Sequence, residues 1–269
     1  MIRKKELKPI YINNLVRIGK ENDGGYVIPK SIFSLCDGLL SYGINKDWSF
    51  EKDFQKYNPR SVIHCYDHTL NFFSLIKFTI KSFFLSILHF LLLDKRRFLN
   101  SFNSLNVIFD YFKFFNKKTL HFKNRIWDIN IGNSIRVKET LKRIESEKVK
   151  KIFIKMDIET AEYRVINSII SSNKIIVGMV IEFHELDKYS EKFNEIINSI
   201  LKYFHIVHIH GNNYSKIIPQ INFPSTIEIT FMNKRDINFP IKACEKEYPI
   251  EGLDQPNRFS KPDYKLNFN

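Results

Sequence analysis

The 269-residue chain is poor in cysteine, and its few cysteines form no recognisable pair. Cys36, Cys65 and Cys244 stand at unrelated spacings without a C-x-x-C motif, which argues against a disulfide framework and against a cysteine-bound zinc site. The charged N-terminus has no apolar run behind it, so the sequence predicts no secretory signal. We therefore expect a reducing, cytoplasmic compartment.

Long apolar runs are also scarce. The apolar stretch 83–93 is far shorter than the roughly twenty residues of a membrane-spanning helix, and basic residues flank it. It lies in a block, 70–122, that is crowded with Phe and Leu and interrupts the alternation of strands and helices. Two interpretations stay open for this block. It is either a helical insertion packed over the mouth of an active site or an amphipathic element that makes peripheral contact with a membrane.

Acidic residues are outnumbered, with 29 Asp or Glu against 42 Lys or Arg and a formal net charge of +13. Such a surface attracts nucleic acid, anionic lipid or an acidic glycan, and the sign of the charge does not choose among them. The sequence contains no recognised nucleic-acid-binding motif, so we expect no nucleic-acid partner. It also lacks a clear D-x-D motif, which argues against a metal-dependent glycosyltransferase.

The most informative segment is residues 152–163, with the sequence IFIKMDIETAEY. Its first five residues form a short apolar run typical of a buried strand, and the apolar residues that follow Tyr163 have helical spacing. Asp157, Glu159 and Glu162 lie between the two, where the strand ends. Because ligands of open α/β sheets bind at the carboxyl ends of the strands, this pattern predicts a site.

The rest of the chain alternates strands and helices, which predicts an α/β fold, a mostly parallel sheet with helices on both faces, in a single domain of residues 1–269. An Asp-Gly turn within 15–29 predicts a β-hairpin in an N-terminal extension, 1–37. Two late apolar runs predict an antiparallel closing pair, and the polar tail after residue 233 is expected to wrap the surface. Further strands are expected at 38–43, 61–67, 175–182, 204–210 and 226–232.

Gly43 and Asp67 together suggest a nucleoside site. A glycine turn after the first core strand lets backbone approach a ligand, and a carboxylate about 20 residues later can accept hydrogen bonds from ribose hydroxyls. The loop lacks the full G-x-G-x-x-G pattern of a pyrophosphate site, which disfavours NAD and FAD and favours a nucleoside without phosphates such as S-adenosylmethionine. The alternative is that Gly43 serves only a tight turn and Asp67 only a helix cap.

Residues 155–162, KMDIETAE, are similar to the K-x-D-I-E-G-A-E signature of the FkbM-type class I S-adenosylmethionine-dependent methyltransferases, with Thr160 in place of the glycine. The resemblance extends over about 15–235, except for the block 70–122. It implies a seven-stranded Rossmann-like sheet, S-adenosylmethionine as the methyl donor, and O-methylation of a sugar hydroxyl. Supporting matches are NDGGY at 22–26, YGIN at 42–45, YDHT at 66–69, VIEFH at 180–184 and IEIT at 227–230.

The resemblance also implies roles for individual residues. Asp67 would hold the ribose, His68 would lie beside the adenine, and Asp157 and Glu159 would lie where the methyl group is transferred. The methionine and adenosine moieties would be lined by Ser41, Tyr42, Gly43 and Asn45.

Methylation of a hydroxyl requires a group that accepts its proton. His184 is the preferred base, because it follows a strand and should face Asp157; the alternative is a histidine that only makes a structural hydrogen bond. A divalent cation held by Asp157, Glu182 and His184 is a less favoured interpretation of the same residues. His205, His208 and His210 are interpreted as ordinary strand histidines.

The leading hypothesis is therefore a cytoplasmic O-methyltransferase acting on a carbohydrate acceptor, either anionic or lipid-linked. The alternative is a basic module that binds nucleic acid or a membrane surface, built on a methyltransferase-like fold with a vestigial site.

Overall fold

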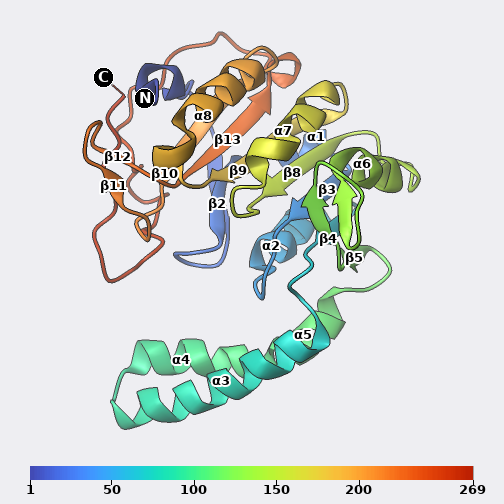
Figure 1. Cartoon of the computed structure of the whole chain (residues 1–269), viewed down its shortest axis with the longest axis vertical. Helices are drawn as coiled ribbons and strands as arrows, with labels where there is room; N and C mark the ends of the chain where they lie inside the picture. The colour runs from blue at the N-terminus through green and yellow to red at the C-terminus, as the bar shows by residue number, and fades with distance from the viewer. Residues whose placement is uncertain (269) are drawn as a thin grey trace.

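Seven strands form the central sheet in a computed structural model that describes residues 1–268 (Figure 1). The strand order is β5-β4-β3-β8-β9-β13-β10, and β13 alone runs antiparallel to its neighbours. This topology confirms the predicted seven-stranded, mostly parallel sheet and the antiparallel closing pair. The strands are β3 (Gly38–Tyr42), β4 (Val62–Tyr66), β5 (Thr119–Phe122), β8 (Ile152–Met156), β9 (Ile176–Phe183), β10 (Phe204–Gly211) and β13 (Ile227–Asn233).

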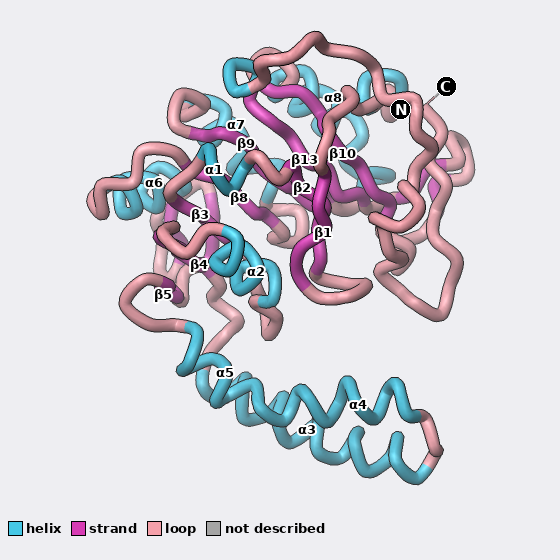
Figure 2. The backbone as a smooth tube through the Cα atoms, turned by 180° about the vertical axis from the view of Figure 1, so that it is seen from behind, coloured by secondary structure: helices cyan, strands magenta, loops and turns pink. Residues whose placement is uncertain are grey.

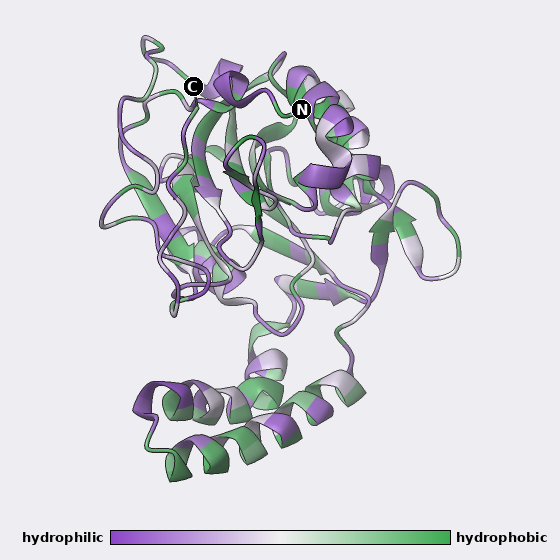
Figure 3. Cartoon of the chain, turned by 60° about the vertical axis from the view of Figure 1, so that its left-hand side comes forward, coloured by the Kyte–Doolittle hydropathy of each residue, from purple (hydrophilic) through white to green (hydrophobic). Residues whose placement is uncertain are grey.

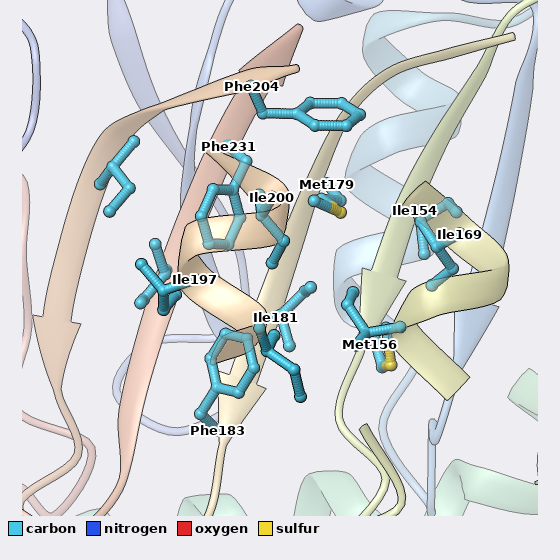
Figure 4. Close-up of a cluster of buried hydrophobic side chains, with 14 of the residues drawn as sticks. Ile154, Met156, Ile169, Met179, Ile181, Phe183, Ile197, Ile200, Phe204 and Phe231 are labelled. Atoms are coloured by element: carbon cyan, nitrogen blue, oxygen red, sulfur yellow. The ribbon is translucent and has the colours of Figure 1, made fainter. Parts of the chain in front are cut away.

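The central strands are buried on both faces, which is why they are continuous apolar runs. Helices α6 (Val137–Glu145), α7 (Glu162–Ser171) and α8 (Leu186–Ile200) cover one face. Figure 4 shows this core, in which Ile169 of α7 and Ile197 and Ile200 of α8 lie against side chains of β8, β9 and β13.

The other face is covered by α1 (Ile32–Leu35), α2 (Ser49–Tyr57) and the β-hairpin of β1 (Leu15–Gly19) and β2 (Gly25–Pro29). The predicted hairpin is confirmed, with antiparallel pairing and positive φ angles of 64° at Asn22 and 90° at Gly24 in its turn. Every residue of β2 is buried, so the hairpin is part of the core and carries its turn to the carboxyl edge of the sheet.

The insertion forms an arm that projects from the sheet edge beside β4 and β5 (Figures 1 and 2). It consists of α3 (Phe72–Leu91), α4 (Lys95–Asn103), the short helix η2 (Ser104–Asn106) and α5 (Val107–Phe114). The sequence-based boundary of 122 is too late, because residues 119–122 are strand β5 of the sheet. The apolar run recognised in the sequence, 83–93, is only part of helix α3. The helix begins at Phe72 and is, by length and composition, long and apolar enough to cross a membrane.

The C-terminal segment wraps the surface, as expected, and is held by buried histidines of β10. His208 Nε2 lies 3.1 Å from Asp254 Oδ1, and His210 Nε2 lies 2.9 Å from Asp263 Oδ2. These contacts identify His208 and His210 as anchors of the C-terminal segment. Two small sheets complete the fold, from β6 (Arg125–Trp127) with β7 (Ser134–Arg136) and β11 (Ile217–Ile218) with β12 (Phe223–Pro224).

Candidate active site

The strand register brings the predicted site residues to one edge. Tyr42 pairs with both Tyr66 and Met156, so the residues that follow them, Gly43, Asp67 and Asp157, leave the sheet side by side. A cavity of about 680 Å³ opens there. Among the residues that line it are Asp23, Tyr26, Gly43, Asn45, Glu51, Asp67, His68, Lys155, Asp157 and Glu159.

Gly43 forms a turn that no other residue fits. Its φ of 76° lies in the left-handed region, and a Cβ added to it would overlap the carbonyl oxygen of Asp157. The backbone around it is tied on both sides, since Gly43 N donates to Tyr66 O at 3.0 Å and Asp157 N donates to Tyr42 O at 2.9 Å. The glycine therefore allows β3 and β8 to end in contact.

Asp67 fixes the loop that follows the glycine. Its Oδ2 accepts hydrogen bonds from the amides of Ile44 at 3.0 Å and Asn45 at 2.6 Å, and its Oδ1 accepts three more from Thr69 and Leu70. Burial raises the pKa of Asp67, but these hydrogen bonds outweigh it and hold the pKa below its ordinary value. The carboxylate is thus ionised and largely saturated, so a ribose hydroxyl would have to share acceptors with the loop.

Two residues predicted to bind the cofactor, Ser41 and Tyr42, do not line the cavity. Both are fully buried in strand β3: the Ser41 hydroxyl contacts Glu51, and Tyr42 Oη lies 2.6 Å from Thr140 Oγ1. Their alternating strand positions direct them into the two faces of the core, which corrects the prediction. Gly43, Asn45, Asp67, His68 and Asp157 do line the cavity.

His184 lies behind the cavity wall among carboxylates. Its Nε2 is 3.6 Å from Asp157 Oδ1, 3.6 Å from Glu159 Oε2 and 3.8 Å from Glu182 Oε1. Its Nδ1 is 3.3 Å from Glu162 Oε1, which also accepts the His184 backbone amide at 2.9 Å. Glu162, at the start of α7, thereby orients the imidazole toward Asp157.

Burial lowers the pKa of His184, but the hydrogen bond with Glu162 and the carboxylates of Glu182 and Asp157 outweigh it and raise the pKa to about 10. Burial, together with Asp157, raises the pKa of Glu182 well above its ordinary value. Ligand atoms of Asp157, Glu182 and His184 all lie within 4.8 Å of one another, so these side chains could also hold a divalent cation.

Two further residues of the cavity wall, Tyr26 and Lys155, touch the acidic cluster. Tyr26 Oη donates to Asp157 Oδ2 and Glu182 Oε2, both at 3.4 Å, and the buried Lys155 ammonium contacts the Gly43 carbonyl and lies 3.9 Å from Asp157 Oδ2. Both belong to motifs noted above, NDGGY and KMDIETAE, but neither had been assigned a role. Their hydroxyl and ammonium groups fix the Asp157 carboxylate at the cavity wall.

Thr160 occupies a position that suits glycine. Its φ is 73° and that of the preceding Glu159 is 51°, so the acidic turn between β8 and α7 contains two left-handed residues in succession. Glycine stands at the Thr160 position in the signature that the sequence resembles. The turn geometry explains that preference, because a β-branched residue is strained at positive φ.

No known protein family matches the sequence, and no curated protein matches it. Among solved structures, the chain is similar to a precorrin-6y C5,15-methyltransferase from Geobacter metallireducens, with a TM-score of 0.37 and 10% identity over 76% of this chain and 86% of that one. It is also similar to fibrillarin in a complex with Nop5p, with a TM-score of 0.36 and 10% identity over 73% of this chain and 72% of that one.

A third similar structure, the 16S rRNA methyltransferase KamB, has a TM-score of 0.32 and 7% identity over 81% of this chain and 100% of that one. Likenesses this remote carry no argument about activity. The function must therefore be argued from the site itself.

Proposed function

We propose that the protein is an S-adenosylmethionine-dependent O-methyltransferase that acts on a sugar hydroxyl of a glycan or glycoconjugate. One observation carries the proposal: the Gly43 turn fixed by Asp67 and the carboxylates of Asp157 and Glu159 line a single cavity of about 680 Å³ at the carboxyl ends of parallel strands. The volume suits a nucleoside ligand together with part of an acceptor.

The residues that line the cavity suit the two parts of such a reaction. The backbone around Gly43 and Asn45, with Asp67 and His68, would hold the adenosine. Asp157 would stabilise the positively charged sulfonium, because its carboxylate is partly shielded from water, and the exposed Glu159 would contribute less. Acidic walls also favour a neutral hydroxyl acceptor over a phosphate.

Bound S-adenosylmethionine would supply the methyl group to the acceptor oxygen with loss of its carbon–sulfur bond, and a carboxylate of the cavity would accept the hydroxyl proton. We assign the proton acceptor to Asp157 rather than to His184, because Asp157 lines the cavity and His184 does not. The Nδ1 of His184 is engaged with Glu162, and its Nε2 faces three carboxylates. His184 is therefore a positioning residue that neutralises and orients the acidic cluster.

Calorimetry with S-adenosylmethionine and S-adenosylhomocysteine tests the cofactor assignment. We expect both to bind, and failure of the folded protein to bind either would refute the proposal. Incubation with the donor and candidate glycans, followed by mass spectrometry, should show the addition of a single methyl group. Chelation with EDTA separates the metal-free reaction proposed here from one assisted by a cation at Asp157, Glu182 and His184, because only the latter would lose activity.

A second candidate, a nucleic-acid-binding module with a vestigial site, finds support only in the net charge of +13. The acidic cavity wall would repel nucleic-acid phosphates. Salt-sensitive binding to DNA or RNA without donor binding would favour this candidate.

A further inference from the structure

The outward surface of the arm is unusually apolar. Helix α3 exposes a continuous arc of large apolar side chains, and the tip after it exposes Leu92 and Leu93, the latter at 89%. Figure 3 shows hydrophobic residues spread over the arm, and Figures 1 and 2 place α3 farther from the body of the protein than α4. The exposed residues of α3 that form this arc are Phe72, Phe73, Ile80, Phe83, Phe84, Ile87, Leu88, Phe90 and Leu91.

The inner surface of the arm carries small hydroxyl side chains beside a few apolar contacts such as Phe90 with Phe98, which departs from the pattern of a helix in water. Of the three residues that α3 buries, two are Ser82 and Ser86, and Ser86 Oγ donates to Ser82 O at 2.7 Å. His89 Nδ1 lies 3.0 Å from Ser101 Oγ of α4. Water-facing helices bury their apolar stripe and expose polar residues. Small and hydroxyl residues at helix contacts with large apolar residues outside are the arrangement found in lipid.

The arm is also basic. Residues 72–114 contain six Lys or Arg and two Asp, and both acids are engaged: Asp110 with Lys52, and Asp94 with Arg97 at 3.4 Å. Lys77 and Lys81 lie on exposed positions of α3, and Lys95 and Arg97 follow the apolar tip. Long basic side chains beside an apolar face can reach lipid phosphates while their stems remain in apolar surroundings.

We propose that the outer face of α3 and the 91–93 tip dock the protein onto a bilayer that contains anionic lipid, with α3 lying in the interface rather than spanning it. Lys77 and Lys81 within the exposed arc oppose deep insertion. Arg96 of α4 opposes it as well, because its Nη2 donates to Asn22 Oδ1 at 2.9 Å and its guanidinium stacks 4.1 Å from the Phe259 ring, which holds the arm beside the body. A second copy of the chain fits this face less well, because self-docking would bring the basic residues of two arms together.

Docking would also place the site near lipid headgroups. A hollow of about 690 Å³ lies between the arm and the body and shares Lys46 and Asp47 with the wall of the site cavity. This step rests on the proposed function: it makes a membrane-linked sugar the acceptor class. The docking itself rests only on the arm.

Vesicle flotation tests the docking without any assay of activity. We expect the full chain to float with vesicles of phosphatidylcholine and phosphatidylglycerol, to bind vesicles of phosphatidylcholine alone more weakly, and to lose the difference at high salt. Ile80→Asp should weaken binding to the anionic vesicles about tenfold or more, because a carboxylate replaces an apolar group in the interface. The matched control is Ile241→Asp in the C-terminal segment, since Ile80 is 52% exposed and Ile241 is 54% exposed.

A second variant, Lys77→Glu with Lys81→Glu, leaves the apolar arc intact. It controls for the possibility that Ile80→Asp weakens binding only because helix α3 unfolds. It should weaken binding to anionic vesicles and leave binding to neutral vesicles unchanged. The proposal would be overturned if Ile80→Asp bound anionic vesicles as tightly as the unsubstituted protein, or if the full chain bound no vesicles. Concentration-dependent self-association that Ile80→Asp abolishes, without vesicle binding, would assign the face to a second copy instead. Calorimetry with S-adenosylhomocysteine on the same samples tests the proposed function independently, so that failure of docking and failure of the proposed function can be told apart.

Discussion

Replacement of Gly43 by alanine tests the geometry on which the site depends. The added Cβ would overlap the Asp157 carbonyl oxygen, which belongs to the backbone and cannot rotate away. To make room, the ends of β3 and β8 must separate, which strains the 2.9 Å hydrogen bond between Asp157 N and Tyr42 O. The same movement shifts the amides that Asp67 holds.

The expected loss has two parts. Alanine at a left-handed φ costs about 1–2 kcal/mol relative to glycine, because its Cβ crowds the following carbonyl. Overpacking against a fixed backbone adds about 1–3 kcal/mol. We therefore expect Gly43→Ala to lower the free energy of unfolding by about 2–5 kcal/mol and to weaken binding of S-adenosylhomocysteine.

Gly252→Ala is the matched control, because its φ is 75° against 76° for Gly43 and an added Cβ would meet nothing within 4 Å. It should lose only the conformational part, about 1–2 kcal/mol, and leave ligand binding unchanged. Urea denaturation gives the free energies, and calorimetry gives the affinities. Equal destabilisation by the two variants would refute the claim that β3 and β8 meet at Gly43.

Thr160→Gly should stabilise the protein by up to about 1 kcal/mol in the same denaturation assay, because Thr160 holds a φ of 73° that glycine adopts freely; an equal gain from Thr160→Ala, which keeps a Cβ, would contradict this explanation. Asp157→Asn should lower the rate of methyl transfer about 100-fold or more while S-adenosylhomocysteine still binds, since an amide cannot accept the proton; undiminished turnover would remove Asp157 from the proposed mechanism. Burial lowers the pKa of His210, but hydrogen bonds with Asp263 and Glu228 outweigh this effect and raise the pKa to about 10. The protonated imidazole therefore stabilises the fold fully below the ordinary histidine pKa near 6.5, and this stabilisation is lost as the pH rises toward 10. His210→Asn should therefore flatten the decline of unfolding free energy between these pH values, whereas His205→Asn should not; a decline that persists unchanged in His210→Asn would show that the imidazole is not the group responsible.

Much of the architecture could be predicted because local pattern and tertiary role agree. The run Ile152–Met156 is apolar at nearly every position because β8 is buried on both faces. The hairpin predicted from the Asp-Gly dipeptide is present, although the positive φ angles of its turn fall at Asn22 and Gly24 and not at Asp23. The boundary of the insertion was harder to predict. Strand β5 follows the arm directly and is only four residues long, too short for its alternation to stand out from the aromatic block around it.

The amino-acid pattern alone was enough to predict six of the seven central strands, the acidic residues that end several of them, and the glycine turn that precedes the carboxylate of Asp67. Only the tertiary structure decided which of these side chains share a space. The register of parallel strands set Gly43 beside Asp157, pleating turned Ser41 and Tyr42 into the core, and the hairpin carried Tyr26 across to Asp157. It also decided that Ser82 and Ser86 of α3 face inward and most of its phenylalanines outward, because which face of a helix is buried depends on the neighbour it packs against, and the local sequence does not identify that neighbour.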